Sequence, residues 1–229
     1  MNSTKFSLLQ DRCDLFLKML GDCTPFALAR FNDGEMAGVE KVGAVVARGD
    51  QEVSESLHEA LREALQYEQE NYFVGLPCPV CWPHHNALAT ELVSDDYPHK
   101  ASAVVLTNRN WEYFVNSFPA AVEGRHITWV GGDDQRVDQL NFQVNGQVKV
   151  PRVNTWGVYN EIVNLDSEFP KDSIVILSCG PTARILARDW FQSRPDLTLL
   201  DVGSVWDPLT RGVVHRCHNG TLPPCKGCN

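Results

Sequence analysis

The sequence lacks both glycine signatures that mark the commonest nucleotide sites of α/β proteins. It contains neither a Gly-x-Gly-x-x-Gly run nor a P-loop with its lysine, which argues against a dinucleotide cofactor and against ATP. Positive charge is also scarce: 20 Lys and Arg face 29 Asp and Glu, a formal net charge of −9. Nonspecific nucleic-acid binding needs a basic surface, so this composition argues against it. An anionic small substrate would need a local arginine cluster or a metal.

Long apolar runs are missing from the first twenty residues. Asp11, Arg12, Asp14 and Lys18 interrupt this stretch, so it has neither the core of a signal peptide nor a membrane span. We therefore expect a cytoplasmic protein. Internal repeats, low-complexity segments and long linkers are also missing, and 229 residues are enough for one large core. The sequence predicts a single domain over residues 1–229.

Short apolar runs alternate with segments of helical periodicity along most of the chain. Continuous β-prone runs suit strands that are buried on both faces, as in a parallel sheet covered by helices. We predict an α/β, Rossmann-like fold, a mostly parallel sheet flanked by helices. The predicted strands are residues 25–30, 72–75, 102–106, 127–130, 174–177 and 197–200, and the predicted helices are 5–20, 51–70, 84–93, 111–118, 155–163 and 182–192.

Two carboxylates follow the first predicted strand. Asp33 and Glu35 flank Gly34, and in a tight turn they could direct hard oxygen ligands toward a divalent cation that carries a nucleotide diphosphate. Arg30 adds a bidentate phosphate donor beside them. A solvated turn before a helix is the other interpretation, because the helix dipole favours Asp and Glu in a first turn.

A second group of candidate residues follows the later strands. Gly180, Pro181 and Thr182 join a strand to a helix, and the backbone N–H groups of such a turn can bind a diphosphate. A plain strand-to-helix connection explains the same residues. Asp201 ends the next strand, while Asn108 and Arg136 stand in polar loops that follow two others. Because parallel strands end at one edge, we predict that these residues line one binding crevice.

Four segments in this order and spacing resemble the DUF1792 group of glycosyltransferases, which define the GT-D fold. The resemblance covers about residues 25–210. The segments are Ala29-Arg30-Phe31-Asn32-Asp33-Gly34-Glu35, Val150-Pro151 with Asn154 and Trp156, Leu177-Ser178-Cys179-Gly180-Pro181-Thr182-Ala183, and Leu200-Asp201-Val202-Gly203.

The resemblance implies an enzyme that moves a sugar from a nucleotide donor, typically UDP-linked, to an acceptor glycan. It assigns Asp33 and Glu35 to an Asp-x-Glu motif that engages Mn²⁺ or Mg²⁺ and the donor diphosphate, with Arg30 beside them. Two departures from the family pattern are Asn32, where glycine is usual, and Cys179, where a leucine is common.

Other readings of the sequence stay open. In a Rossmann-like methyltransferase, Ser178-Cys179-Gly180 and Asp201 would contact an adenosyl cofactor. A zinc-stabilised module could bind glycans or nucleotides without turnover. A direct attack by an acceptor hydroxyl needs a base. The candidate carboxylates are Asp133, Asp134, Asp138, Asp201 and Asp207.

Cysteine and histidine gather in an irregular tail, residues 206–229. Cys78 and Cys81 form one Cys-x-x-Cys pair, and Cys225 and Cys228 form another. Two such pairs can bind one tetrahedral Zn²⁺, so we predict a structural zinc site that pins the tail. A set drawn from the tail, His215 and Cys217 with the second pair, is the alternative, and unlinked thiols are a third possibility.

Overall fold

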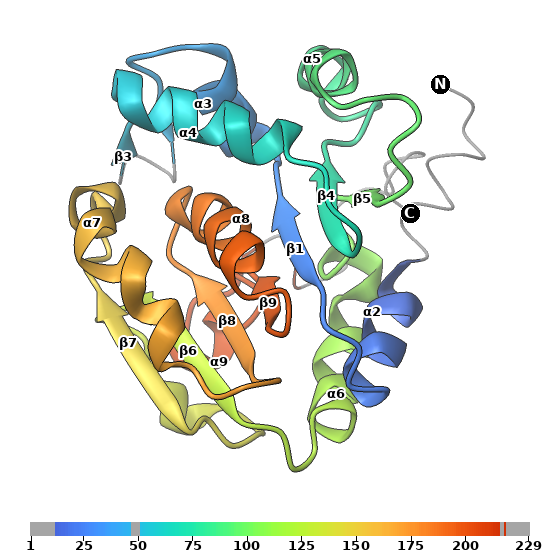
Figure 1. Ribbon diagram of the computed structural model, residues 1–229, viewed down its shortest axis with the longest axis vertical. Helices are drawn as coiled ribbons and strands as arrows, with labels where there is room; N and C mark the ends of the chain where they lie inside the picture. The colour runs from blue at the N-terminus through green and yellow to red at the C-terminus, as the bar shows by residue number, and fades with distance from the viewer. Residues whose placement is uncertain (1–11, 47–50, 216–217, 219–229) are drawn as a thin grey trace.

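The computed structural model describes residues 12–46, 51–215 and 218, and a seven-stranded sheet forms its centre (Figure 1). The strand order is β5-β4-β1-β9-β8-β6-β7, and every neighbouring pair is parallel. This confirms the predicted α/β fold with a parallel sheet. The strands are β1 (Ala27–Arg30), β4 (Tyr72–Leu76), β5 (Lys100–Ser102), β6 (Ile127–Gly132), β7 (Gly146–Val150), β8 (Ile174–Ser178) and β9 (Thr198–Asp201); β2 (Val45–Val46) and β3 (Gln51–Glu52) form a separate antiparallel pair.

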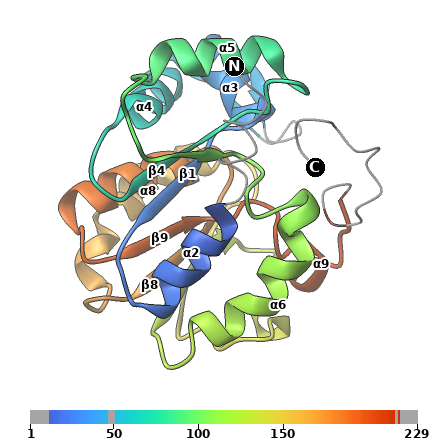
Figure 2. The ribbon, with the colours of Figure 1, turned by 90° about the vertical axis from the view of Figure 1, so that its right-hand side faces the viewer.

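Helices cover both faces of the sheet, as Figures 1 and 2 show. Alternate residues of a strand point to opposite faces, and the two cores follow this rule. In β8, for example, Val175 belongs to the core on one face and Ile176 to the core on the other. The first face carries α3 (Asp33–Glu40), α4 (Glu55–Gln66), α5 (Pro83–Leu92), α7 (Tyr159–Ile162) and α8 (Thr182–Ser193); the second carries α2 (Arg12–Gly21) and α6 (Trp111–Ala121), and α9 (Asp207–Thr210) follows β9.

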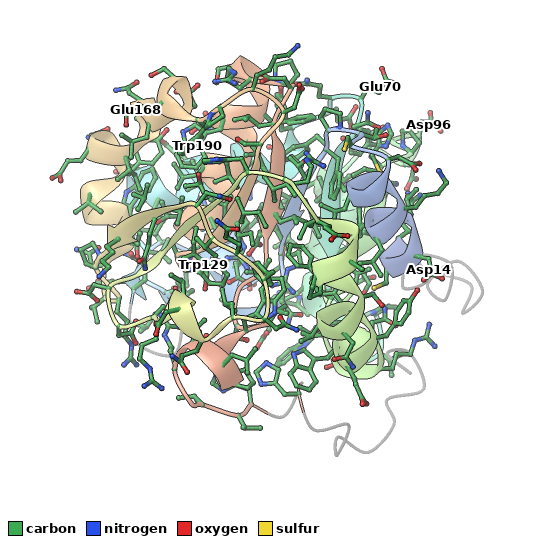
Figure 3. The ribbon with its side chains drawn as sticks, turned by 90° about the horizontal axis from the view of Figure 1, so that it is seen from below. Asp14, Glu70, Asp96, Trp129, Glu168 and Trp190 are labelled. Carbon is green, nitrogen blue, oxygen red and sulfur yellow. The ribbon has the colours of Figure 1, made fainter. Side chains whose placement is uncertain are left out.

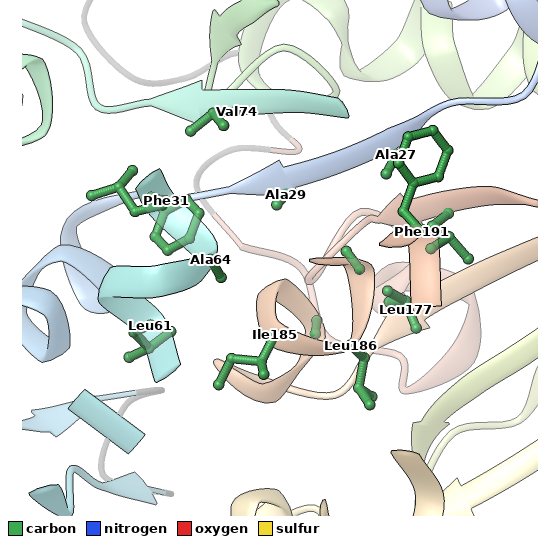
Figure 4. Close-up of a cluster of buried hydrophobic side chains, with 14 of the residues drawn as sticks. Ala27, Ala29, Phe31, Leu61, Ala64, Val74, Leu177, Ile185, Leu186 and Phe191 are labelled. Atoms are coloured by element: carbon green, nitrogen blue, oxygen red, sulfur yellow. The ribbon is translucent and has the colours of Figure 1, made fainter. Parts of the chain in front are cut away.

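The core between α4, α8 and β1 is built from small and large side chains that interdigitate (Figure 4). Ala27 and Ala29 of β1 leave room for Ile185 and Phe191 of α8, and Leu61 of α4 packs in the same cluster. Burying a side chain such as Leu, Ile or Phe contributes about 1.5–3 kcal/mol. This packing fixes α8, and with it the residues of its first turn, against the end of β1.

Two tryptophans lie inside the molecule, whereas several carboxylates lie at its periphery (Figure 3). The indole of Trp129 donates to Gln135 Oε1 at 3.0 Å, and that of Trp190 donates to the carbonyl of Val163 at 2.6 Å. A buried indole N–H needs such an acceptor. Both rings therefore fill the core without leaving this polar group unpaired.

Some predicted elements differ from the observed ones. The strand predicted at 102–106 is wrong: β5 ends at Ser102, and the apolar residues that follow form turns, where the Val105 N–H donates to the Ser102 carbonyl at 3.0 Å. The residues of this run are apolar because most of them are buried, and this apolar composition made the run resemble a strand. The helix predicted from residue 51 starts at Glu55, because Ser54 caps it by accepting from the Leu57 N–H. The 3₁₀ segments are Asn108–Asn110, Val137–Gln139, Thr155–Val158 and Val163–Glu168, and the last two flank α7 in the stretch predicted as one helix at 155–163.

None of the helices in the described residues has both the length and the apolar character needed to cross a bilayer.

Candidate functional site

A cavity of about 570 Å³ lies at the carboxyl ends of β6, β8 and β9. In open α/β sheets this edge is where ligands bind. Segments that follow five different strands contribute to its wall, as expected when parallel strands end together. The lining residues are Glu35, Gly132, Asp134, Arg136, Pro151, Arg152, Thr155, Ser178, Cys179, Gly180, Arg184, Gly203, Ser204, Asp207, Thr210, Arg211, Val213 and His215.

Two arginines and two carboxylates form a cluster, the charged quartet, behind and along this wall. Arg184 of α8 forms ion pairs with both carboxylates, with Nε 2.9 Å from Asp201 Oδ2 and Nη2 3.2 Å from Glu35 Oε1. Arg30 donates its backbone N–H to Asp201 Oδ2 at 2.9 Å and its Nε to the Asp201 carbonyl at 2.7 Å. The side chain of Asp201 is fully buried and that of Arg184 is 5% exposed. Two positive and two negative charges therefore balance in a poorly solvated place.

Backbone carbonyls hold the two arginines as firmly as the carboxylates do. Arg184 donates to the Arg30 carbonyl at 2.7 Å and to the Gly180 carbonyl at 2.5 Å, and Arg30 donates to the Ala103 carbonyl at 3.2 Å. The neighbouring Asp201 and Glu35 carboxylates raise the pKa of Arg184 against the opposing effect of burial. Arg184 is thus a fixed cation whose guanidinium group reaches the cavity wall.

The predicted acidic pair lies in the first turn of α3, not in a tight turn that would direct both carboxylates to one side. Asn32 is the N-cap residue with φ −97°, an extended backbone that needs no glycine. Its N–H donates to Glu35 Oε2 at 3.2 Å, one half of a capping box. Asp33 lies outside the lining of the cavity, where burial and the charge of Glu35 raise the pKa of its carboxyl group. The two carboxylates therefore have different surroundings.

Glu35 of the predicted Asp-x-Glu motif already has two partners. Its Oε1 lies 3.2 Å from Arg184 Nη2, and its Oε2 accepts the Asn32 N–H at 3.2 Å. A divalent cation that carries a nucleotide takes one or two protein carboxylates, and water and phosphate oxygens complete its shell. Within the described ranges, no group of three or more His, Cys, Asp or Glu side chains is placed to hold a metal ion. A cation at Glu35 would compete with Arg184 for this carboxylate.

A second charged group, the rim cluster, closes one side of the cavity. Arg211 donates Nε and Nη2 to the two oxygens of Asp134 at 3.0 and 2.9 Å and Nη1 to Asp207 Oδ1 at 3.1 Å. The other oxygen of Asp207 lies 2.8 Å from His215 Nε2. These contacts join the loop after β6 to α9 and the segment that follows it.

The other predicted contacts divide between the cavity wall and its surroundings. Gly180, with φ +62°, and Arg136 line the cavity, whereas Pro181 and Thr182 are buried behind it and Asn108 lies elsewhere, before α6. The Ala183 N–H, at the start of this helix, already donates to the Gly180 carbonyl at 3.2 Å. Of the anion site predicted at the start of α8, Gly180 therefore lines the cavity, but the Ala183 N–H is already bonded within the turn.

Sequence reasoning missed Arg184, although the sequence contained a signal for it. Arg184 is the third residue of α8, and the helix dipole disfavours a cation in a first turn. Asp201 and Glu35 compensate for this, and both come from other parts of the chain. A cationic residue in the first turn of a helix therefore indicates a side chain that pairs with carboxylates from other parts of the chain.

A chain of neutral hydrogen bonds supports the floor of the cavity. Gln135 Nε2 donates to Ser178 Oγ at 2.8 Å, and Ser178 Oγ donates to the Gly203 carbonyl at 2.8 Å. Cys179, beside Ser178, is buried, and burial raises the pKa of its thiol to about 12. Cys179 is therefore a neutral wall residue at physiological pH.

The predicted zinc site can be placed only in part. Cys78 is buried and Cys81 is exposed, and the Cys81 N–H donates to Cys78 Sγ at 3.4 Å. Cys217, Cys225 and Cys228 lie outside the described residues. The zinc site stays a prediction.

Comparisons with known proteins give a structural likeness but no sequence relative. No protein-family model and no curated protein matches the chain. A solved structure described as a new glycosyltransferase (DUF1792) from Streptococcus sanguinis superposes with a TM-score of 0.67 at 17% identity, covering 89% of this chain and 85% of that one. Another, described as showing that the highly conserved domain of unknown function 1792 has a distinct glycosyltransferase fold, gives 0.61 at 19% identity, covering 84% and 78%. The chain therefore has the fold of the DUF1792 domains, as the sequence motifs predicted.

Proposed function

We propose that the protein is a glycosyltransferase that moves a sugar from a nucleotide donor, with UDP-sugars the first candidates, to an acceptor hydroxyl of a glycan or glycoconjugate. The single observation that carries the proposal is the arginine-lined cavity at the carboxyl edge of the sheet. Arg136, Arg152, Arg184 and Arg211 line it, in a protein whose formal net charge is −9. Arginine is suited to bidentate phosphate recognition. The fold shared with DUF1792 domains supports the same conclusion.

The size of the cavity agrees with a nucleotide-sized ligand. Its volume of about 570 Å³ lies within the range of small-molecule sites, about 300–1,000 Å³. Fixed cations on its wall would stabilise the negative charge that develops on the departing nucleoside diphosphate, which is the main electrostatic task in such a transfer. Of the carboxylates considered as the base, Asp134 and Asp207 line the cavity, whereas Asp201 does not.

The methyltransferase alternative loses one of its predicted contacts. It assigned Ser178-Cys179-Gly180 and Asp201 to an adenosyl cofactor, and the first three residues line the cavity, but the Asp201 carboxylate is fully buried and bonded to Arg30 and Arg184. A binding module without turnover remains an outcome of the experiment below.

The test combines ligand binding with turnover. Thermal shift of the intact chain with UDP, GDP, CDP and ADP, each with EDTA or with Mn²⁺, should give a shift with one nucleotide, because a bound ligand raises the apparent stability. Release of the nucleoside diphosphate from the corresponding sugar nucleotide should follow. Binding without release would favour the binding module, and a shift with S-adenosylmethionine alone would contradict the proposal. The predictions of Mn²⁺ or Mg²⁺ dependence are tested by the paired conditions.

A further inference from the structure

We propose that arginine side chains, with Arg184 at their centre, hold the diphosphate of the donor without a divalent cation, and that Glu35 is the counter-ion of Arg184. The inference rests on the proposed function, because it assumes a diphosphate ligand in this cavity. It departs from the Asp-x-Glu metal site that the sequence motif predicted.

The carboxylates on the cavity wall already have arginine partners. Three carboxylate side chains are among its lining residues, and each is bonded to an arginine: Glu35 to Arg184 at 3.2 Å, and both Asp134 and Asp207 to Arg211 at 2.9–3.1 Å. A cation that binds one of them has to compete with a guanidinium group for that carboxylate. The lining contains four arginines and three carboxylates.

The charges of the quartet balance one another. Arg30 and Arg184 are matched by Asp201 and Glu35, and Asp201 is fully buried while Glu35 is 15% exposed. If Glu35 turned to a divalent cation, Arg184 would keep only Asp201, which it shares with Arg30. The new ion would also stand beside a fixed guanidinium charge, and like charges repel strongly where solvent is scarce.

Arg184 lies in the first turn of α8. Its guanidinium group lines the cavity next to Gly180, so the positive end of the helix and the arginine charge act on the same space. A diphosphate oxygen that approached this point could replace Glu35 as the partner of Arg184 Nη2. The anion would then gain a charge-assisted hydrogen bond from a donor that is already oriented.

Glu35→Gln is the decisive variant, because the two models predict opposite results. Glutamine can still accept the Asn32 N–H, so the capping box of α3 and the fold should be preserved. Without the negative charge, Arg184 is released for the ligand. Isothermal titration of UDP and of inorganic pyrophosphate in EDTA should show binding to the wild type and at least about fivefold tighter binding to the variant, because fivefold is the effect of one charge at contact distance in bulk water and this place is poorly solvated.

Matched arginine variants complete the experiment. Arg136→Gln removes an exposed guanidinium group from the cavity wall and should weaken pyrophosphate binding about fivefold. Arg109→Gln removes an equally exposed arginine outside the lining and should leave the affinity unchanged. Far-UV circular dichroism and thermal melting of each variant verify that it is folded.

The outcomes separate this inference from the proposed function. Binding in EDTA that Glu35→Gln tightens supports the inference, even if no sugar nucleotide is turned over, in which case the proposed function fails. Binding and turnover that both need Mn²⁺ and disappear in Glu35→Gln would overturn the inference and leave the proposed function intact. Absence of UDP and pyrophosphate binding under both conditions would overturn the inference as well.

Discussion

The charged quartet and the rim cluster hold the same kinds of side chain in different surroundings. In the quartet, the side chains of Asp201 and Arg184 are 0% and 5% exposed, whereas in the rim cluster those of Asp134 and Arg211 are 35% and 20% exposed. A buried charge that loses its partner is costly, while a solvated one is compensated by water. The quartet therefore fixes the shape of the site, and the Asp134–Arg211 pair of the rim cluster can exchange its partners for a ligand at lower cost, whereas the Asp207 side chain, 6% exposed, is as buried as the quartet.

Removing one carboxylate from each cluster gives the largest contrast. Asp201→Asn should destabilise the protein by about 3–5 kcal/mol, because Arg30 and Arg184 both lose a buried counter-ion. Asp134→Asn, the matched rim variant, should cost less than about 1 kcal/mol. Urea denaturation at pH 7 measures both free energies of unfolding. Equal effects would contradict the distinction between the two clusters.

Two glycines with positive φ, one beside Arg30 of the quartet and one in open space, allow a comparison of smaller stability effects. Gly203 has φ +52°, and a Cβ atom there would lie 2.6 Å from Arg30 Nη2. Gly212 has φ +67° and no atom within 4 Å of such a Cβ. Gly203→Ala should therefore cost about 2–3 kcal/mol and Gly212→Ala about 1 kcal/mol, the backbone strain alone.

The melting temperatures of the two variants and of the wild type in the same buffer measure these losses of stability. If Gly212→Ala lost as much stability as Gly203→Ala, the space around Arg30 would not be filled as the structure has it, and the quartet would be less rigid than proposed.

The smallest effects concern pH. Burial and Glu35 raise the pKa of Asp33, so its contribution to stability is present below the pKa of the unfolded chain, about 4, and is lost as the pH rises through the folded value. A hydrogen bond from Arg194 lowers the pKa of Asp196, so its contribution is present above about pH 4 and is lost as the pH falls through the folded value.

Replacing these two carboxylates should therefore give opposite pH dependences. From pH 3 to pH 7, Asp33→Asn should gain stability relative to the wild type and Asp196→Asn should lose it, each by less than about 3 °C in melting temperature. Melting curves measured across this range provide the test. Parallel curves for the two variants would show that Asp33 has no raised pKa in the folded protein.

The sequence by itself determined the α/β class, most of the strands and the edge of the sheet where polar residues gather. Apolar runs such as Ile174–Leu177 are specified locally, because a strand buried on both faces needs every residue to be apolar. The resemblance to the DUF1792 group, read from short motifs, is confirmed at the level of the fold.

Tertiary structure alone decided how the charges are paired. Arg184, Asp201 and Glu35 are 17 to 166 residues apart in the chain, and only the parallel packing of β1, β8 and β9 brings them together. Local spacing placed Asp33 and Glu35 near each other but could not show that one side chain meets Arg184 while the other lies outside the cavity. Local sequence fixes which groups carry charge, whereas the fold fixes which opposite charge each of them meets, because Coulomb interactions depend on distance in space and on burial.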